Sequence, residues 1–502
     1  MTRETILVRC ARTLFSSLTI LCLLAMAGAA AAADLRLAAS DQGRLSAPIL
    51  SDHMVLQRGQ VVPIWGEGLD GTRVEVELRD PRTGRLVAEA STVVVAQRWR
   101  VDLSPLETGG PYDLRVSDSR GQTREVVDIL VGEVWFAVGQ SNLAPGRFPA
   151  DATWNLDFSD PAGPVDGSWV RAFSNGNDRD GVGWQSRPGD TAGWLATGLA
   201  EALALQEGAS VPVGIVNLAV PGAAIRRWTG SGSGDRSILS EDVGDYYKSW
   251  LLPCLPYAAR GVFWWQGESD HQGSGAPQYA ERFRRLIEDW RTDFENDELF
   301  FAAVMLPNGK GVAMDELVRG YPRSRPPEAR AAGLMYDAYL STSREKPHVG
   351  LALTKDLPGG THPSDREVYA ERLVDVARHD VYGESFAYSG PVFDCMERVG
   401  DTLRIHFKGD TGLGLRAGGV LRKGIRATVL QGVQIGTDAE ARVWANTAID
   451  GEVLEVFHPT IRNPAYMNYA WRVNPRWANL FNEAGLAAGP FAASWPRDAC
   501  AN

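Results

Sequence analysis

The feature that most constrains the fold is a long middle section in which short apolar runs alternate with helical segments. The runs are too continuously apolar for strands with one face in water, so they indicate strands buried on both faces. They lie at residues 211–220, 261–266, 299–306 and 349–355. Helical spacing is present at 194–205 and 368–376, and one apolar helix face is formed by Tyr279, Phe283, Leu286, Ile287 and Trp290. This alternation of buried strands and helices predicts a three-layer α/β/α domain with a mostly parallel sheet.

The sections on either side show the two-residue alternation of β-strands instead. Alternating runs occur at 73–78 and 113–116 before the middle section, and at 402–407 and 452–457 after it. A chain of 502 residues is too long for a single core. We therefore expect a β-sandwich-like domain at 34–129, the α/β/α domain at 130–385 and a second β-sandwich-like domain at 386–502.

The first 33 residues have the pattern of a secretory signal peptide. Arginines precede an apolar stretch, and the alanines at 29–33 resemble a cleavage site. The apolar stretch is too short to span a bilayer comfortably, which argues against a membrane anchor. We therefore expect a secreted or periplasmic protein. Cleavage removes three arginines and one glutamate and lowers the net charge from −11 to about −13, which argues against nucleic acid or an anionic membrane as a partner.

Cleavage would leave three cysteines, which in an oxidising compartment allow one disulfide and one free thiol. Cys254 lies in an apolar stretch and is expected as a buried thiol, so a bridge between Cys395 and Cys500 is favoured. The sequence holds no Cys-x-x-Cys pair, no His-Glu-x-x-His and no clustered histidines among its seven. Such patterns are typical of zinc sites. We expect neither a metal nor a cofactor, and the oligomeric state stays open.

Four polar motifs follow apolar runs of the middle section, at the ends where ligands bind in open α/β sheets. In the first, Gly139-Gln140-Ser141-Asn142, a glycine allows a sharp turn and a serine follows it. The second contains Gly222, the third runs from Gln266 to Glu268, and the fourth contains His362. Each alone also fits a tight turn, a polar loop or a residue before a helix. Together they supply what acyl transfer needs, namely a nucleophile, a histidine base and donors for an oxyanion.

Beyond these motifs, the sequence resembles the sialate O-acetylesterase family of secreted SGNH-type carbohydrate esterases over essentially the whole chain after residue 33. Residues 131–142 are similar to the nucleophile block of the family, and residues 265–269 to its third block. The block at 221–228 is similar as well, although proline and alanine replace the first glycine and the threonine of the family pattern. Further similar stretches lie at 51–58, 62–66, 469–471, 479–482 and 489–491.

The resemblance implies that Ser141 is the nucleophile and His362 its general base. It also implies an oxyanion hole made of the backbone N–H groups of Ser141 and Gly222 and the side-chain amide of Gln266. Neutral donors of this kind stabilise a tetrahedral oxyanion without adding a charge that must be desolvated.

Three residues beside these positions are candidate contacts for the substrate: Asn142, Arg226 and Glu268. For Arg226 the alternative is an exposed, solvated pair with Arg227. For Glu268 the alternative is a structural role, in which its carboxylate accepts backbone N–H groups of its own loop.

One departure from the family pattern concerns the acid that orients the histidine. Relatives usually carry an aspartate two or three residues before it, which fixes the tautomer and stabilises the imidazolium. Here Gly360 and Gly359 occupy these positions. Asp356 is the candidate orienting acid if the glycines let the loop fold back, whereas Asp365 is expected to serve the N-terminus of the next helix. The alternatives are a Ser-His dyad oriented by a backbone carbonyl, or a site without activity, because losing this carboxylate can lower turnover about ten-thousandfold.

The resemblance therefore implies a serine esterase that removes O-acetyl groups from carbohydrates through an acetyl-enzyme. Acetylated sialic acid and acetylated plant polysaccharides are equally compatible substrates. The alternative from another class is a carbohydrate-binding protein built on a disabled esterase. A lipase or thioesterase is disfavoured, because nothing between Asn142 and Gly222 resembles a lipid-binding lid.

Overall fold

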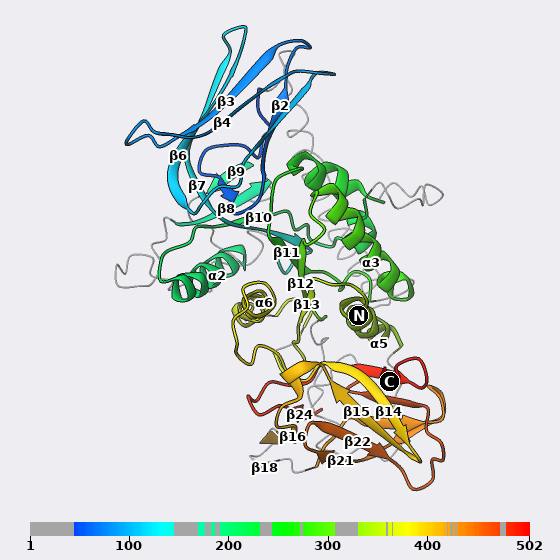
Figure 1. Ribbon diagram of the computed structural model, residues 1–502. Coiled ribbons are helices and arrows are strands. Elements are labelled where there is room, and N and C mark those ends of the chain that lie inside the picture. The colour runs from blue at the N-terminus through cyan, green and yellow to red at the C-terminus, as the bar shows by residue number, and fades with distance from the viewer. Residues whose placement is uncertain are drawn as a thin grey trace, which may run out of the picture.

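The computed structural model describes residues 45–144, 169–175, 182–185, 191–230, 243–271, 275–306, 330–357, 360–363, 365–418, 420–421, 425–426, 429–471 and 478–501. The expected signal peptide at 1–33 lies outside the described residues, and so does Gly359. Figure 1 shows a β-rich N-terminal part, a middle part of sheet and helices, and a β-rich C-terminal part. Among the helices of the described residues, none is both long and apolar enough to cross a membrane.

The middle part is built on a parallel sheet with the strand order β13-β12-β11-β7-β10-β8, and β9 pairs with β8 in the antiparallel direction. Its strands are β7 (Thr123–Gly139), β8 (Val170–Asn175), β9 (Val182–Gln185), β10 (Val213–Asn217), β11 (Gly261–Trp265), β12 (Phe300–Val304) and β13 (Val349–Ala352). Every residue of β10, β11, β12 and β13 is buried. The continuous apolar runs of the sequence thus correspond to strands that are covered on both faces.

Two pairs of helices cover this sheet in the described part of the chain (Figure 1). α2 (Thr191–Glu207) packs with α6 (Glu367–Asp380), and α3 (Ala276–Asp293) packs with α5 (Arg330–Glu345). Alternate residues of β7 enter the two cores, since Trp135 belongs to the hydrophobic core that contains residues of α2 and α6, whereas Phe136 belongs to the core that contains residues of α3 and α5. The five residues of the expected apolar face of α3 are all buried. The expected three-layer arrangement is therefore present. Short helical turns at η2 (Ile225–Trp228), η3 (Tyr247–Leu251) and η4 (Leu252–Cys254) lie between β10 and β11.

The N-terminal part contains antiparallel strands that continue directly into the middle part. Its strands are β1 (Val55–Gln57), β2 (Val62–Glu67), β3 (Arg73–Arg79), β4 (Leu86–Val93), β5 (Arg98–Leu103) and β6 (Gly109–Asp118). β3 pairs with β4 and β6, and β2 pairs with β5. The first half of β7 pairs with β6, and its second half lies between β10 and β11. The expected boundary at 129/130 thus falls inside one strand, because β7 belongs to both parts.

The described residues of the C-terminal part form two four-stranded antiparallel sheets and two short strand pairs. One sheet has the order β14 (Phe393–Val399), β15 (Thr402–Phe407), β22 (Val453–Phe457), β21 (Asn446–Asp450). The other has the order β20 (Arg442–Trp444), β19 (Val433–Gly436), β23 (Tyr466–Tyr469), β25 (Phe491–Ser494). The short pairs are β16 (Arg416–Ala417) with β24 (Leu480–Phe481), and β17 (Val420–Leu421) with β18 (Ile425–Arg426), and η5 spans Gly409–Gly412.

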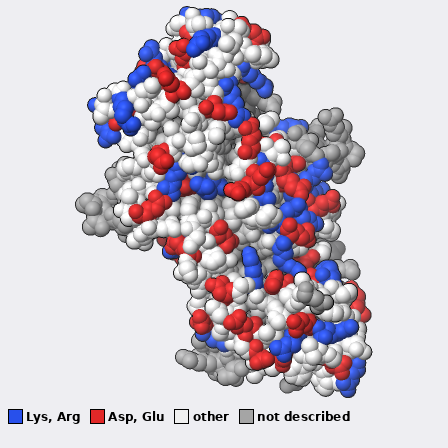
Figure 2. Space-filling model, viewed as in Figure 1, with Lys and Arg blue, Asp and Glu red and all other residues white. Residues whose placement is uncertain are grey.

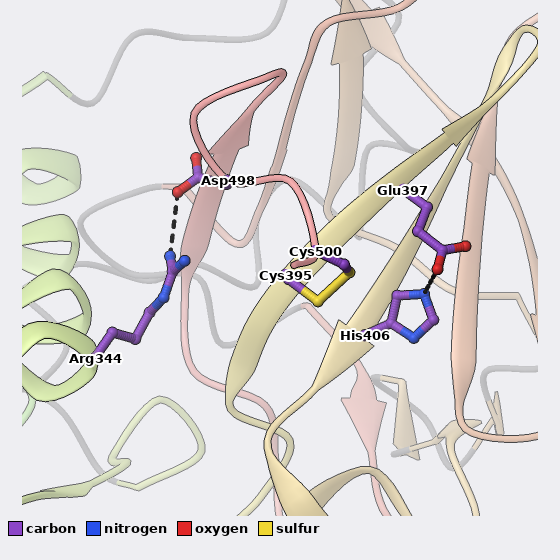
Figure 3. The surroundings of a disulfide bond; sticks show 6 residues. All are labelled: Arg344, Cys395, Glu397, His406, Asp498 and Cys500. Atoms are coloured by element: carbon purple, nitrogen blue, oxygen red, sulfur yellow. Dashed lines mark hydrogen bonds and ion pairs between the residues drawn. A yellow bond between two sulfur atoms is a disulfide. The ribbon is translucent and has the colours of Figure 1, made fainter. Parts of the chain in front are cut away.

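The three cysteines of the described residues behave as the sequence predicts. Cys395 of β14 forms a disulfide with Cys500 near the end of the chain, as Figure 3 shows. Cys254 is a buried free thiol, and burial raises its pKa to about 12. The disulfide fastens the last residues of the chain to the first strand of the C-terminal part.

Charged side chains lie interspersed on the surface, and several connect separate parts of the chain. Figure 2 shows acidic and basic side chains intermingled over the viewed face. The guanidinium of Arg100 in β5 donates to both carboxylate oxygens of Glu295, just after α3, at 2.6 and 2.8 Å. This bidentate pair ties the N-terminal part to the middle part.

Candidate active site

The nucleophile candidate lies on a tight turn at the carboxyl end of β7. Gly139 ends the strand with a φ of +149°, and a Cβ atom there would lie 2.0 Å from the backbone oxygen of Trp265. Only glycine fits this close approach of β7 to the end of β11. The backbone N–H of Gln140 then donates to the same Trp265 oxygen at 3.0 Å. The turn places Ser141 at the sheet edge, with 4% of its surface exposed.

The structure brings Ser141 and His362 together although 221 positions separate them in the sequence. The Oγ atom of Ser141 lies 2.8 Å from Nε2 of His362. This distance lies within the reach that a general base needs to take the serine proton. His362 is exposed, so the pair is accessible from solvent.

Asn142 connects the nucleophile turn to two other motifs. Its side chain is fully buried, and its Nδ2 donates to Glu268 Oε1 at 2.7 Å and to the backbone oxygen of Thr361 at 3.1 Å. Because Thr361 directly precedes His362, the amide of Asn142 ties the histidine segment to the turn that carries Ser141. These hydrogen bonds therefore give Asn142 a structural role, because they connect the nucleophile turn to Glu268 and to the histidine segment.

Glu268 lies behind this connection, and its carboxyl group is buried. Its Oε1 also accepts the indole N–H of Trp265 at 3.2 Å, whereas Oε2 is buried with no hydrogen-bond partner among the described residues. Burial raises the pKa of Glu268 to about 7, although hydrogen bonds from its own backbone N–H, from Asn142 and from Trp265 lower it. The carboxyl group thus accepts from a backbone N–H of its own loop as well as from the side chains of Asn142 and Trp265.

The side-chain amide of Gln266, the expected third donor of the oxyanion hole, is hydrogen-bonded to groups of the protein. Its side chain is fully buried, and Nε2 donates to Asp270 Oδ2 at 2.7 Å and to the backbone oxygen of Ala223 at 3.0 Å. Asp270 Oδ2 also accepts the backbone N–H of Ile225 at 2.8 Å. Both amide hydrogens are thus engaged, and Gln266 fastens the segment after Gly222 to the end of β11. The sequence could not reveal this, because the partners of a buried amide depend on how neighbouring strand ends meet.

Gly222 follows β10 at the same carboxyl edge of the sheet. It is exposed, and its φ of +74° is a left-handed conformation that favours glycine. Arg227 pairs with Asp245, and its guanidinium stacks over Tyr246 at 3.6 Å. Arg226 is half-buried, and its charge lowers the pKa of Asp270, although burial has the larger and opposite effect on that carboxyl. The two arginines are therefore not an exposed, solvated pair.

Asp356 lies between the strand β13 and helix α6. Its Oδ2 accepts a hydrogen bond from Arg372 of α6 at 3.0 Å. Its Oδ1 is buried and has no hydrogen-bond partner among the described residues. An ionised carboxylate in this state retains the capacity to accept one more N–H.

The segment that leads to the histidine contains the glycine found where relatives carry an acid. Gly360 has a φ of +130°, a conformation that residues with a Cβ rarely adopt. An aspartate at 360 would therefore be strained in this loop. Asp365 is exposed and lies two residues before α6, where Arg366 is the N-cap residue and makes no side-chain capping hydrogen bond.

One cluster of metal-ligating residue types occurs in the described part of the chain, and it lies away from this site. Glu397, His406 and Cys500 come together in the C-terminal part (Figure 3). Cys500 is bonded to Cys395, so it has no thiolate to offer a metal. The donor set is therefore reduced to one carboxylate and one imidazole.

A parallel α/β/α domain with a serine and a histidine at the carboxyl edge of its sheet has the architecture of an ester hydrolase. Residues 131–350 match the family described as "Carbohydrate esterase, sialic acid-specific acetylesterase". The match includes Ser141, Gly222 and Gln266 and ends before Asp356 and His362.

Relatives and a solved structure agree with this match. The chain is 26% identical to the sialate O-acetylesterases of Homo sapiens and Pongo abelii over 394 residues, which is 70% of this chain and 74% of each relative. The crystal structure of a carbohydrate acetylesterase from Xanthomonas citri superposes with a TM-score of 0.71 at 27% identity, over 90% of this chain and all of that one. These findings confirm the resemblance to the sialate O-acetylesterase family, and they indicate a carbohydrate O-acetylesterase, a carboxylic ester hydrolase.

Proposed function

We propose that the protein is a secreted or periplasmic serine esterase that removes acetyl groups from the hydroxyl groups of carbohydrates through an acetyl-enzyme. The observation that carries the proposal is the 2.8 Å contact between Ser141 Oγ and His362 Nε2. The signal-peptide pattern of residues 1–33 supports export. The substrate class follows from the relatives, which are described as sialate or carbohydrate acetylesterases.

In the first half of the reaction, His362 Nε2 takes the hydroxyl proton while Ser141 Oγ bonds to the acetyl carbonyl carbon. The backbone N–H groups of Ser141 and Gly222 are the proposed donors to the oxyanion. The C–O bond to the sugar then breaks, and the imidazolium returns the proton to the sugar oxygen. This leaves a free sugar hydroxyl and acetyl-Ser141.

In the second half, His362 takes a proton from water, and the water oxygen attacks the acetyl carbonyl. Collapse of the tetrahedral intermediate releases acetate and returns the proton to Ser141. We propose Asp356 as the orienting acid, a role that needs its Oδ1 to accept the second ring N–H of His362, because among the described residues the Asp356 carboxylate is hydrogen-bonded to Arg372 and not to His362. Gln266 is assigned the role of holding the Gly222 segment in place. Asn142 and Glu268 are assigned to the support of the site, and Arg226 remains a candidate contact for the substrate.

The test is acetate release from O-acetylated sialic acid and from acetylated xylan by the wild type and by Ser141→Ala. A matched control is Ser117→Ala in β6, which removes a hydroxyl beside Thr123, at the opposite end of β7 from Ser141. Release by the wild type and by the control, but not by Ser141→Ala, would support the esterase and identify its substrate class.

A fluorophosphonate probe tests the same chemistry without a choice of sugar. It should label the wild type at Ser141, and the labelling should disappear in His362→Ala. If the folded wild type neither releases acetate nor reacts with the probe, the proposed esterase function is wrong. Retention of the protein on immobilised glycans would then favour a carbohydrate-binding protein.

A further inference from the structure

A buried lysine connects the C-terminal part to the strand end from which the histidine segment begins. Lys355 follows β13 closely, and only 4% of its surface is exposed. Its ammonium group donates to the backbone oxygen of Ala478, and Nζ lies 3.4 Å from the hydroxyl oxygen of Tyr469. The charge also lies 5.7 Å from the ring centre of Tyr469 and 5.3 Å from that of Phe481. A residue of the middle part thus inserts its side chain into the C-terminal part.

Asp356, the next residue, is held by a different element, the helix α6. Asp356 is paired with Arg372 of α6 at 3.0 Å, and Arg372 also donates to the backbone oxygen of Leu353 at 3.1 Å. Two consecutive residues therefore attach this strand end to two different elements. Lys355 attaches it to the C-terminal part, and Asp356 attaches it to the helix that follows the histidine.

Burying an ammonium group is unfavourable unless partners compensate for the loss of water. Burial lowers the pKa of Lys355 to about 7, and the neighbouring carboxylate of Asp356 opposes this shift. An apolar residue of similar length would fill the same space without this penalty. What the lysine adds is directional bonding to the Ala478 oxygen, which fixes the strand end relative to the C-terminal part.

We propose that Lys355 is a positioning residue for His362, so that the C-terminal part is a component of the active-site scaffold. This inference rests on the proposed function, because it assigns His362 the role of general base. His362 is exposed, so the attachment of its segment at either end contributes to its placement beside Ser141. Asn142 holds the histidine end through Thr361, and Lys355 with Asp356 holds the beginning. A shift of about 1 Å at a reacting group can lower the rate about a hundredfold.

The test variant is Lys355→Met, which keeps an unbranched apolar side chain in the pocket and removes the bond to Ala478. We expect kcat for 4-nitrophenyl acetate to fall by about 10- to 100-fold, with KM within about twofold of the wild type. Labelling of Ser141 by the fluorophosphonate probe should slow by a similar factor. A change in KM alone, or rates equal to the wild type, would overturn the proposal.

The matched control is Arg344→Met, which removes a second charged connection between the middle and C-terminal parts. Arg344 at the end of α5 pairs with Asp498 at 3.1 Å (Figure 3). It does not touch the strand end before the histidine segment, so kcat should stay within about twofold of the wild type. If both variants lose activity equally, general loosening of the contact between the parts explains the loss, and the assignment to Lys355 is wrong.

Hydrogen exchange separates this inference from the proposed function, because it needs no catalysis. Peptides that cover residues 353–357 and 360–363 should exchange faster in Lys355→Met than in the wild type or in Arg344→Met. Unchanged exchange in these peptides would overturn the positioning role even in an active esterase. Faster exchange in a protein whose wild type hydrolyses no ester would leave the attachment standing and place the failure in the proposed function.

If Lys355→Met does not fold, Tyr469→Phe tests the same attachment from the C-terminal side. It removes the hydroxyl that Lys355 contacts and that accepts the backbone N–H of Leu480 at 2.8 Å. We expect the same direction of change in kcat and in exchange of the histidine segment, with a smaller amplitude. Wild-type values in both measurements would overturn the proposal.

Discussion

Replacement of Asn142 by alanine tests whether the histidine segment is held by the nucleophile turn. The variant removes one N–H group from the backbone oxygen of Thr361 and another from Oε1 of Glu268. The side chain of Asn142 is fully buried, so water does not readily replace the lost donors. Glu268 keeps the donor from Trp265, whereas no other donor to the Thr361 oxygen is described.

The magnitude follows from these two acceptors. Leaving a buried acceptor without its donor costs about 1–3 kcal/mol. Because Glu268 retains one donor, its share should lie near the lower end, and we expect a total loss of about 2–4 kcal/mol in the free energy of unfolding. Loss of the Thr361 contact also releases His362, so kcat should fall by about a hundredfold.

Urea unfolding gives the stability change, and initial rates with 4-nitrophenyl acetate give kcat and KM. The matched control is Asn482→Ala in the C-terminal part. Asn482 is 2% exposed, and its Nδ2 likewise donates to two backbone oxygens, those of Ser389 at 2.9 Å and Thr411 at 3.3 Å. The Asn482→Ala variant should show a similar loss in the free energy of unfolding, with kcat unchanged. If Asn142→Ala keeps a wild-type kcat, or loses no more activity than Asn482→Ala, the reasoning about the histidine segment is refuted.

Three further predictions concern the turn, a buried acid and the disulfide. Gly139→Ala should unfold the protein or lower its Tm strongly, because the new Cβ would lie 2.0 Å from the Trp265 oxygen and overpacking alone costs about 1–3 kcal/mol. Glu268 has a pKa of about 7 instead of 4.5, so the folded state retains a proton that the unfolded state releases. Its stabilising contribution is therefore fully present below pH 4.5 and is lost as the pH rises through 7, by up to about 3 kcal/mol. Glu268→Gln should flatten this slope in urea unfolding at pH 5 and pH 7.5. Reduction of the Cys395–Cys500 disulfide, which closes a loop of 105 residues, should lower stability by about 4–5 kcal/mol in thermal unfolding with dithiothreitol.

Each of these has a control in the same chain. Gly121→Ala also places a Cβ at a positive φ, of +88°, but with open space around it, so it should lose much less stability than the variant at 139. Glu440→Gln, at an exposed loop, should leave the pH slope unchanged. Cys254→Ala should not alter the response to reductant. Equal effects at 139 and 121, a Glu268→Gln slope identical to the wild type, or a wild-type Tm that ignores dithiothreitol would contradict the respective prediction.

The sequence by itself was sufficient to predict the layered middle part and the meeting of the Ser141 and His362 motifs at one edge of its sheet. The continuous apolar runs correspond to β10, β11, β12 and β13, and the apolar face at 279–290 corresponds to α3. Such patterns are readable because burial on one or two faces imposes a period on neighbouring residues. The motifs were also sufficient to predict that Ser141 and His362 lie together, because turns at the ends of parallel strands bring distant residues to one edge of the sheet.

Other features were decided only by the tertiary structure. β7 pairs with strands of the N-terminal part and of the middle part, so the expected boundary at 129/130 falls inside one strand. Gln266 gives its amide hydrogens to Asp270 and Ala223, and Lys355 enters the C-terminal part beside Tyr469. A buried polar group bonds to whatever donors and acceptors the packing of distant segments places within about 3 Å of it. The identity of these partners produces no periodic pattern in the local sequence. It can be seen only in the folded structure, where the strands and their neighbours are in place.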